Sequence, residues 1–100
     1  MNKKKTPGQL IKTLCLDSLN LSVTDAAKAL KVSRQVLSML INGRLHITPS
    51  MALRLEQVFN TDARSWLMLQ LEYDLEQAKK KKLNLQRVSK KRIRVPKTLA

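Results

Sequence analysis

Four side chains able to hydrogen-bond or pack against a ligand recur at helical spacing in the middle of the chain. They are Gln35, Ser38, Met39 and Asn42, at positions i, i+3, i+4 and i+7, which form one stripe of an α-helix. Glutamine can donate to and accept from the edge of adenine, and arginine can form two hydrogen bonds with guanine. Arg34 stands at one end of this stripe. These residue types suit the reading of nucleic-acid bases.

Few other side chains could support catalysis or metal binding. The chain has one cysteine, Cys15, and one histidine, His46, which cannot supply an internal disulfide or an ordinary zinc site. Helical spacing from Ile11 places Cys15 in the core, and His46 falls in a loop, where exposure or a phosphate contact is the simpler role. Asp62 suits a helix cap, and no glycine-rich phosphate loop or nucleophile motif is present. We therefore expect no enzymatic activity, no metal and no cofactor.

The charge of the chain is large and unevenly placed. The 100 residues contain 20 Lys plus Arg and 7 Asp plus Glu, a net charge of +13, and are enough for one small domain. Residues 1–5 hold three lysines and residues 79–100 hold ten basic side chains, with no acid in either segment. Residues 6–78 carry seven of each sign and are neutral. This excess indicates a polyanionic partner, either nucleic acid or an anionic membrane.

The centre of the chain is predicted to be helical throughout, because period-2 alternation is absent before the tail. We expect an all-α fold of five helices. The first helix is predicted to begin at Pro7-Gly8 and to end at Asn20, and the second to begin after an N-cap at Thr24. The third is predicted over 34–42 after an N-cap at Ser33. The fourth is predicted from Pro49, after an N-cap at Thr48, to Asn60, and the fifth from Ala63, after an N-cap at Asp62, to about Lys80.

Apolar residues give these helices their expected buried sides. The predicted core positions of the first, third and fourth helices are Leu10, Ile11, Leu14 and Cys15; Val36, Leu37, Leu40 and Ile41; and Met51, Ala52, Leu55, Val58 and Phe59. The fifth helix is apolar on two sides, with Trp66, Leu69 and Tyr73 on one and Leu67, Leu71, Leu75 and Ala78 on the other. Either this helix lies centrally in the bundle, or one of its sides is a subunit or partner interface.

Two short helices, a tight turn and a polar face on the second helix are the layout of a helix-turn-helix. Ala27 is small enough for close packing, and Val32 can fill the turn. Lys31 stands where such a turn prefers glycine, and a left-handed residue there would cost about 1–2 kcal/mol. Alternatively, the polar stripe is an ordinary solvated face. The predicted DNA contacts are Ser33, Arg34, Gln35, Ser38, Met39, Asn42 and Arg44, of which Ser33, Asn42 and Arg44 suit phosphates.

Segment 24–44 resembles the helix-turn-helix of the phage-repressor (Xre/Cro) type. The start Thr6-Pro7-Gly8-Gln9 is similar to the His-Pro-Gly-Glu start of the HigA antitoxins, and residues 45–55 and 66–75 are similar to the fourth and fifth helices of that family. The most diagnostic string is Trp-Leu-x-Leu-Gln-x-x-Tyr-Asp-Leu, which begins at Trp66. The resemblance covers residues 6 to about 78. We divide the chain into a basic arm (residues 1–6), the helix-turn-helix domain (7–80) and a basic tail (81–100), which is expected to be disordered or a short extended segment.

The resemblance implies an antidote of a bacterial type II toxin–antitoxin module. Such proteins neutralise a HigB toxin, an mRNA endonuclease, and repress their own operon as dimers. The dimer commonly involves the C-terminal helix, which suggests Trp66, Leu69, Gln70 and Tyr73 as interface residues. HigB toxins are usually basic and would be repelled by a basic tail. A stand-alone Xre-type regulator without a toxin therefore stays open, as does a module that binds only protein.

Several interpretations of the structure and role of the basic tail are open. Disorder is favoured because like charges repel, although residues 92–95 alternate as a short strand would. The tail could bind flanking DNA, lie on a membrane surface or only keep the chain soluble, and we favour DNA. No apolar run is long enough to span a membrane, and no secretory signal follows the first lysines. We expect a bacterial cytoplasmic protein that associates with the nucleoid when bound to DNA.

Overall fold

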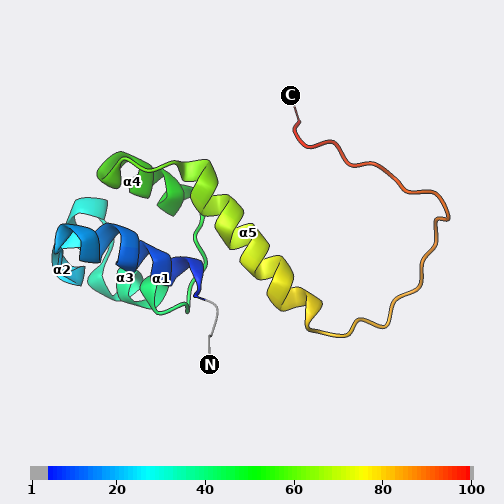
Figure 1. The fold of residues 1–100 in the computed structure, drawn as a ribbon, viewed down its shortest axis with the longest axis horizontal. Coiled ribbons are helices and arrows are strands. Elements are labelled where there is room, and N and C mark those ends of the chain that lie inside the picture. Colours follow the sequence, from blue (N-terminus) through cyan, green and yellow to red (C-terminus); the bar gives the residue numbers. More distant parts are fainter. Residues whose placement is uncertain (1–4, 100) are drawn as a thin grey trace.

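The computed structural model describes residues 5–99, and within them every regular element is helical (Figure 1). The elements are α1 (Pro7–Ile11), a π-helical segment (Lys12–Asp17), α2 (Val23–Leu30), α3 (Arg34–Ile41), α4 (Pro49–Phe59) and α5 (Ala63–Lys79). No β-strand occurs between residues 5 and 99, so the predicted all-α class is confirmed. The short strand considered at residues 92–95 does not form.

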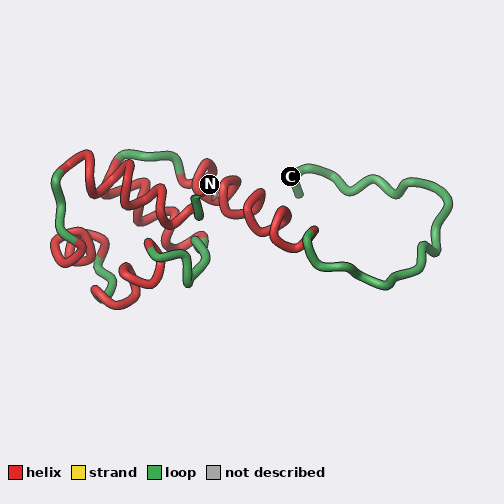
Figure 2. The backbone as a smooth tube through the Cα atoms, turned by 60° about the horizontal axis from the view of Figure 1, so that its bottom comes forward, coloured by secondary structure: helices red, strands yellow, loops and turns green. Residues whose placement is uncertain are grey.

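The first four helices pack into a body from which α5 projects (Figure 1). The fully buried large side chains come from all the elements of that body: Ile11, Leu16, Leu30, Leu37, Leu40 and Leu55. The first part of α5 packs on α4 and α1, and its second part runs away from the body toward the tail (Figure 2). Of the two alternatives considered for this helix, a central position in the bundle is therefore wrong. Leu71 and Leu75 are about half exposed, at 49% and 51%.

The start of α1 lies directly on the end of α3. Thr6 caps α1 by accepting from the Gln9 backbone nitrogen at 3.2 Å, and the Gln9 side chain accepts from the Thr6 nitrogen at 2.9 Å. Gly8 is buried in this contact, and a Cβ built there would overlap the carbonyl oxygen of Leu40. Only glycine lets the two backbones approach this closely. The Pro-Gly start is thus part of the packing that holds α3.

The π-helical segment after α1 changes which side chains reach the core. A π-turn brings residues i and i+5 together, and the Lys12 ammonium accordingly lies 3.0 Å from the Asp17 carboxylate. Ordinary helical spacing predicted Leu14 in the core, but its side chain is 58% exposed. Leu16, which that spacing did not select, is 1% exposed. The prediction for Leu14 is wrong because the wider turn rotates the chain.

Most predicted helix caps are confirmed, with one exception. Ser22, and not Thr24, opens α2: its hydroxyl accepts from the Asp25 backbone nitrogen at 3.0 Å, and its backbone is extended. Thr24 lies inside the first turn of α2. The confirmed N-caps are Ser33, Thr48 and Asp62, and the confirmed left-handed ends are Asn20 and Asn60.

The predicted core is otherwise largely confirmed. Cys15 is buried at 3% exposure, and desolvation raises the pKa of its thiol above the ordinary value. Two predicted core valines are partly exposed, Val36 at 39% and Val58 at 38%, because the buried sides of their helices centre on neighbouring residues. No helix in residues 5–99 is long and apolar enough to cross a membrane.

A matched pair of leucines tests the π-helical register. Replacing Leu16 with Ala should lower the free energy of unfolding by about 2–5 kcal/mol, because it empties a fully buried site. Replacing Leu14 with Ala should cost only about 0.5 kcal/mol, because that side chain faces solvent. Chemical denaturation of the two variants measures the difference. Equal losses would show that Leu14 is buried as ordinary helical spacing predicts.

Candidate nucleic-acid interface

The turn between α2 and α3 sets the position of the candidate interface. Ala27 is 2% exposed where the two helices meet, so that a larger side chain would separate them. Val32 packs against the core, and its nitrogen donates to the Ala27 carbonyl at 3.1 Å. The Lys31 nitrogen donates to the Lys28 carbonyl at 3.2 Å. This pair of bonds is the Schellman ending of a helix, which reverses the chain with a left-handed residue.

Lys31 is that left-handed residue, with φ 57° and ψ 44°. The conformational cost considered for this position is therefore present, at about 1–2 kcal/mol relative to a relaxed residue. Arg54 of α4 offsets part of this cost by stabilising the turn. Its Nη1 donates to the carbonyl of Leu30 at 2.7 Å and to that of Lys31 at 3.2 Å. These carbonyls lie at the end of α2, where helical partners are lacking. Sequence reasoning missed Arg54, although it stands beside the apolar side of its helix.

The N-terminus of α3 is held by two side chains predicted to contact DNA. The Ser33 hydroxyl accepts from the Val36 nitrogen at 3.0 Å and caps the helix. Nε of Arg34 donates to the Thr24 hydroxyl at 3.1 Å, which ties the start of α3 back to α2. Both residues are exposed, so the Ser33 hydroxyl proton and the outer nitrogens of Arg34 can still meet a phosphate or base.

The predicted outer stripe of α3 is unevenly exposed. Gln35 is exposed, and its amide has no hydrogen-bond partner within residues 5–99. Ser38 and Met39 are half-buried, and the Asn42 amide nitrogen donates to the Ser38 carbonyl at 2.8 Å. Arg44 is exposed just after α3. Gln35 and Arg44 are therefore the predicted contacts whose side chains are unengaged in this part of the chain. Val36, placed in the core by its spacing, adds an apolar group that could meet a thymine methyl.

Basic residues outnumber acidic ones around the helix-turn-helix, in which Asp25 is the one acidic residue of α2, although the centre of the chain is neutral. Residues 26–55 contain five basic and no acidic residues, and four of the seven acids follow Val58, three of them in α5. The basic residues are Lys28, Lys31, Arg34, Arg44 and Arg54. A segment with one sign of charge attracts a polyanion.

Two of the predicted interface residues on α5 serve the fold of the chain itself. Trp66 is 4% exposed, and its indole nitrogen donates to the Thr61 hydroxyl at 2.8 Å. Gln70 is 7% exposed, accepts from the Ile47 nitrogen at 2.7 Å and donates to the Asp74 carboxylate at 2.9 Å. Gln70 thus fixes the loop after α3 to α5. Leu69, at 39% exposure, and the half-buried Tyr73 keep surface for a partner.

A short helix, a turn with a left-handed residue and a second short helix with an exposed polar end define a helix-turn-helix. The family model described as helix-turn-helix matches residues 11–66. The chain therefore belongs to the helix-turn-helix family, in its Xre-type branch, whose members are DNA-binding regulators and typically not enzymes.

Curated relatives align with most of the chain. Virulence-associated protein A' of Dichelobacter nodosus is 47% identical over 78 residues, which cover 77% of this chain and 67% of that protein. An uncharacterised HTH-type transcriptional regulator of Escherichia coli K12 is 40% identical over 73 residues, covering 73% of this chain and 65% of the relative. The chain thus spans about two thirds of the length of these relatives.

Solved structures show which members of this family the chain resembles. The Pseudomonas aeruginosa antitoxin HigA, solved with the higBA promoter, has a TM-score of 0.72 and 33% identity, covering 76% of this chain and 83% of that one. Other structural neighbours are antidote proteins of plasmid maintenance and addiction modules. The resemblance to the HigA antitoxins is confirmed.

A matched pair of lysine substitutions tests the strained turn. Replacing Lys31 with Gly should raise the free energy of unfolding by about 1 kcal/mol, because glycine adopts the left-handed conformation without strain. Replacing Lys28 with Gly, one turn earlier in α2, should lower it by about 0.5–1 kcal/mol. Thermal and urea unfolding give both values. A loss of stability in the Lys31 variant would contradict the left-handed assignment.

Proposed function

We propose that the chain is a sequence-specific operator-binding repressor that acts as a dimer. In this proposal α3 enters the major groove of DNA with its N-terminal end foremost. Gln35 contacts a base, while Ser33, Arg34, Asn42 and Arg44 position the helix, with base contact also open to Arg34. Two copies would read half-sites about 34 Å apart.

The observation that carries the proposal is the exposed and unengaged amide of Gln35 on an otherwise well-packed α3. Because packing fixes the backbone of α3, only the side chain of Gln35 has to be ordered when it reads a base edge. The five basic residues of the segment 26–55 favour the binding of DNA, which is a polyanion. The neighbouring HigA was solved with its own promoter, which supports an operator as the target.

A pair of glutamine substitutions tests this role of α3. Replacing Gln35 with Ala should weaken operator binding by about 1–3 kcal/mol and leave binding to random duplex unchanged, because the lost contact is to a base. Replacing Gln57 with Ala, an exposed glutamine on α4, should change neither. Fluorescence anisotropy with operator and random duplexes gives the four affinities. An unchanged preference in the Gln35 variant would remove this residue from base reading.

We extend the proposal to neutralisation of a HigB-type mRNA endonuclease by a cytoplasmic antitoxin. The structural likeness to HigA antitoxins and module antidotes supports this role. The exposed apolar residues of α5, among them Leu69, offer a surface for a second copy or a toxin. A stand-alone transcriptional regulator is the second candidate, supported by the relative described as an HTH-type transcriptional regulator and by the basic tail.

Co-expression with the product of the adjacent gene separates the two candidates. A HigB-type toxin should arrest growth alone, and this chain should restore growth and co-purify with the toxin. The matched control is the Gln35→Ala variant, which should still neutralise the toxin because its lesion affects base reading only. Failure of the chain to bind the adjacent product or to restore growth would favour the stand-alone regulator.

A further inference from the structure

Nearly half of the basic residues of the chain lie in a segment that follows the last helix. Nine of the twenty Lys and Arg residues fall in 80–99, with no acidic residue among them. From residue 80 to residue 99 every residue is exposed except the half-buried Ser89. The segment has no helix or strand over that range and forms a wide arc beyond the end of α5, which turns back toward the body at its C-terminal end (Figure 1). Its charge is therefore available to an external partner.

The tail is long enough to reach DNA that α3 does not touch. Twenty residues, 80–99, span roughly 65 Å when extended. The longest dimension of the molecule is 53 Å, even with the tail as it lies in the structure. One turn of duplex is about 34 Å. A tail anchored at the end of α5 can thus pass the body and lie along the duplex beside a bound half-site.

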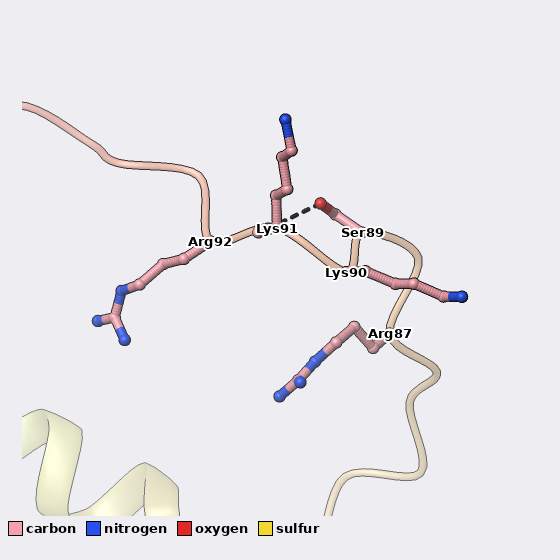
Figure 3. Close-up of a pocket in the computed structure, with 5 residues that line it drawn as sticks. All are labelled: Arg87, Ser89, Lys90, Lys91 and Arg92. Atoms are coloured by element: carbon pink, nitrogen blue, oxygen red, sulfur yellow. Dashed lines mark hydrogen bonds between the residues drawn. The ribbon is translucent and has the colours of Figure 1, made fainter.

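The side chains of the tail suit a row of phosphates better than one enclosed anion. The Ser89 hydroxyl donates to the Lys91 carbonyl at 2.8 Å and bends the chain between two groups of cations. Around this bend Arg87 and Arg92 extend to one side, while Lys90 and Lys91 extend in other directions (Figure 3). Charges that spread in this way can each neutralise a separate phosphate, with no requirement for base sequence.

We propose that residues 80–99 form a second DNA contact, which binds the phosphates of duplex flanking the half-site read by α3. The inference rests on the proposed function, because the binding of α3 to its half-site holds the duplex beside the tail. A membrane surface is the weaker partner, because the apolar residues of the tail are scattered along an extended chain and form no amphipathic helix. The tail would raise affinity and on-rate, while discrimination would stay with α3.

The test measures the salt dependence of binding for the full chain and two full-length variants. In the charge variant five tail cations become Gln: Arg87, Lys90, Lys91, Arg92 and Arg94. In the matched control five apolar tail residues become Ala: Leu83, Leu85, Val88, Ile93 and Val95. Each protein is titrated with an operator duplex cut at its half-site edges and with one extended by about two helical turns on each side.

On the extended duplex the charge variant should lose up to about 4.5 units per protomer from the slope of log K against log salt, because each phosphate contact contributes about 0.9. The control should keep the full slope. On the trimmed duplex the charge variant and the full chain should differ little. Equal slopes for the charge variant and the full chain on the extended duplex would overturn the proposal. An equal loss on both duplexes would also overturn it, since the tail would then contact operator phosphates.

Two further readouts separate this inference from its alternatives. If the unmodified chain bound operator and random duplex equally, the proposed function would fail, while the tail contact would still be measured on extended random duplex. Binding of the full chain and the charge variant to vesicles containing 30% phosphatidylserine in phosphatidylcholine tests the membrane alternative. Tail-dependent vesicle binding together with an unchanged DNA slope would assign the tail to membranes and overturn the proposal.

Discussion

The interaction on which the site depends is the pair of hydrogen bonds from Arg54 to the carbonyls of Leu30 and Lys31. The turn they close holds a lysine in a left-handed conformation, so the chain reverses at a conformational cost. Three further contacts fix α3 on the other side of that turn: the Ser33 cap, the bond from Arg34 to Thr24 and the close approach at Gly8. Together they present Gln35 on a helix with little freedom to move.

The distribution of charge divides the chain into parts with different capacities. Residues 26–55 carry five basic residues and no acid, α5 holds three of the seven acids, and residues 79–100 carry ten basic residues. A polar face on a rigid helix can discriminate between base pairs, whereas cations on an extended tail respond to phosphate alone. The net charge of +13 therefore belongs mostly to the part of the chain least suited to reading sequence.

Much of the fold could be predicted because its signals are local. A cap such as Thr48 acts within one turn, so the sequence shows it directly, and the spacing of Leu37 and Leu40 is enough to orient α3. The exposure of Leu14 could not be predicted, because the π-helical turn departs from ordinary helical spacing. Arg54 and Gln70 act across the fold on residues 23 or more positions away, and a single sequence holds no mark of such partners.

In the proposed function α3 supplies the discrimination between DNA sequences, and most of the excess charge does not contribute to it. The most direct measurement is the ratio of operator to random-duplex affinity over a range of salt concentrations. Phosphate contacts shared by both duplexes weaken together as salt rises, whereas base contacts are much less affected. We predict that both affinities fall while their ratio persists or grows. A ratio that declines to one at high salt would show that the preference is electrostatic and would contradict the claim.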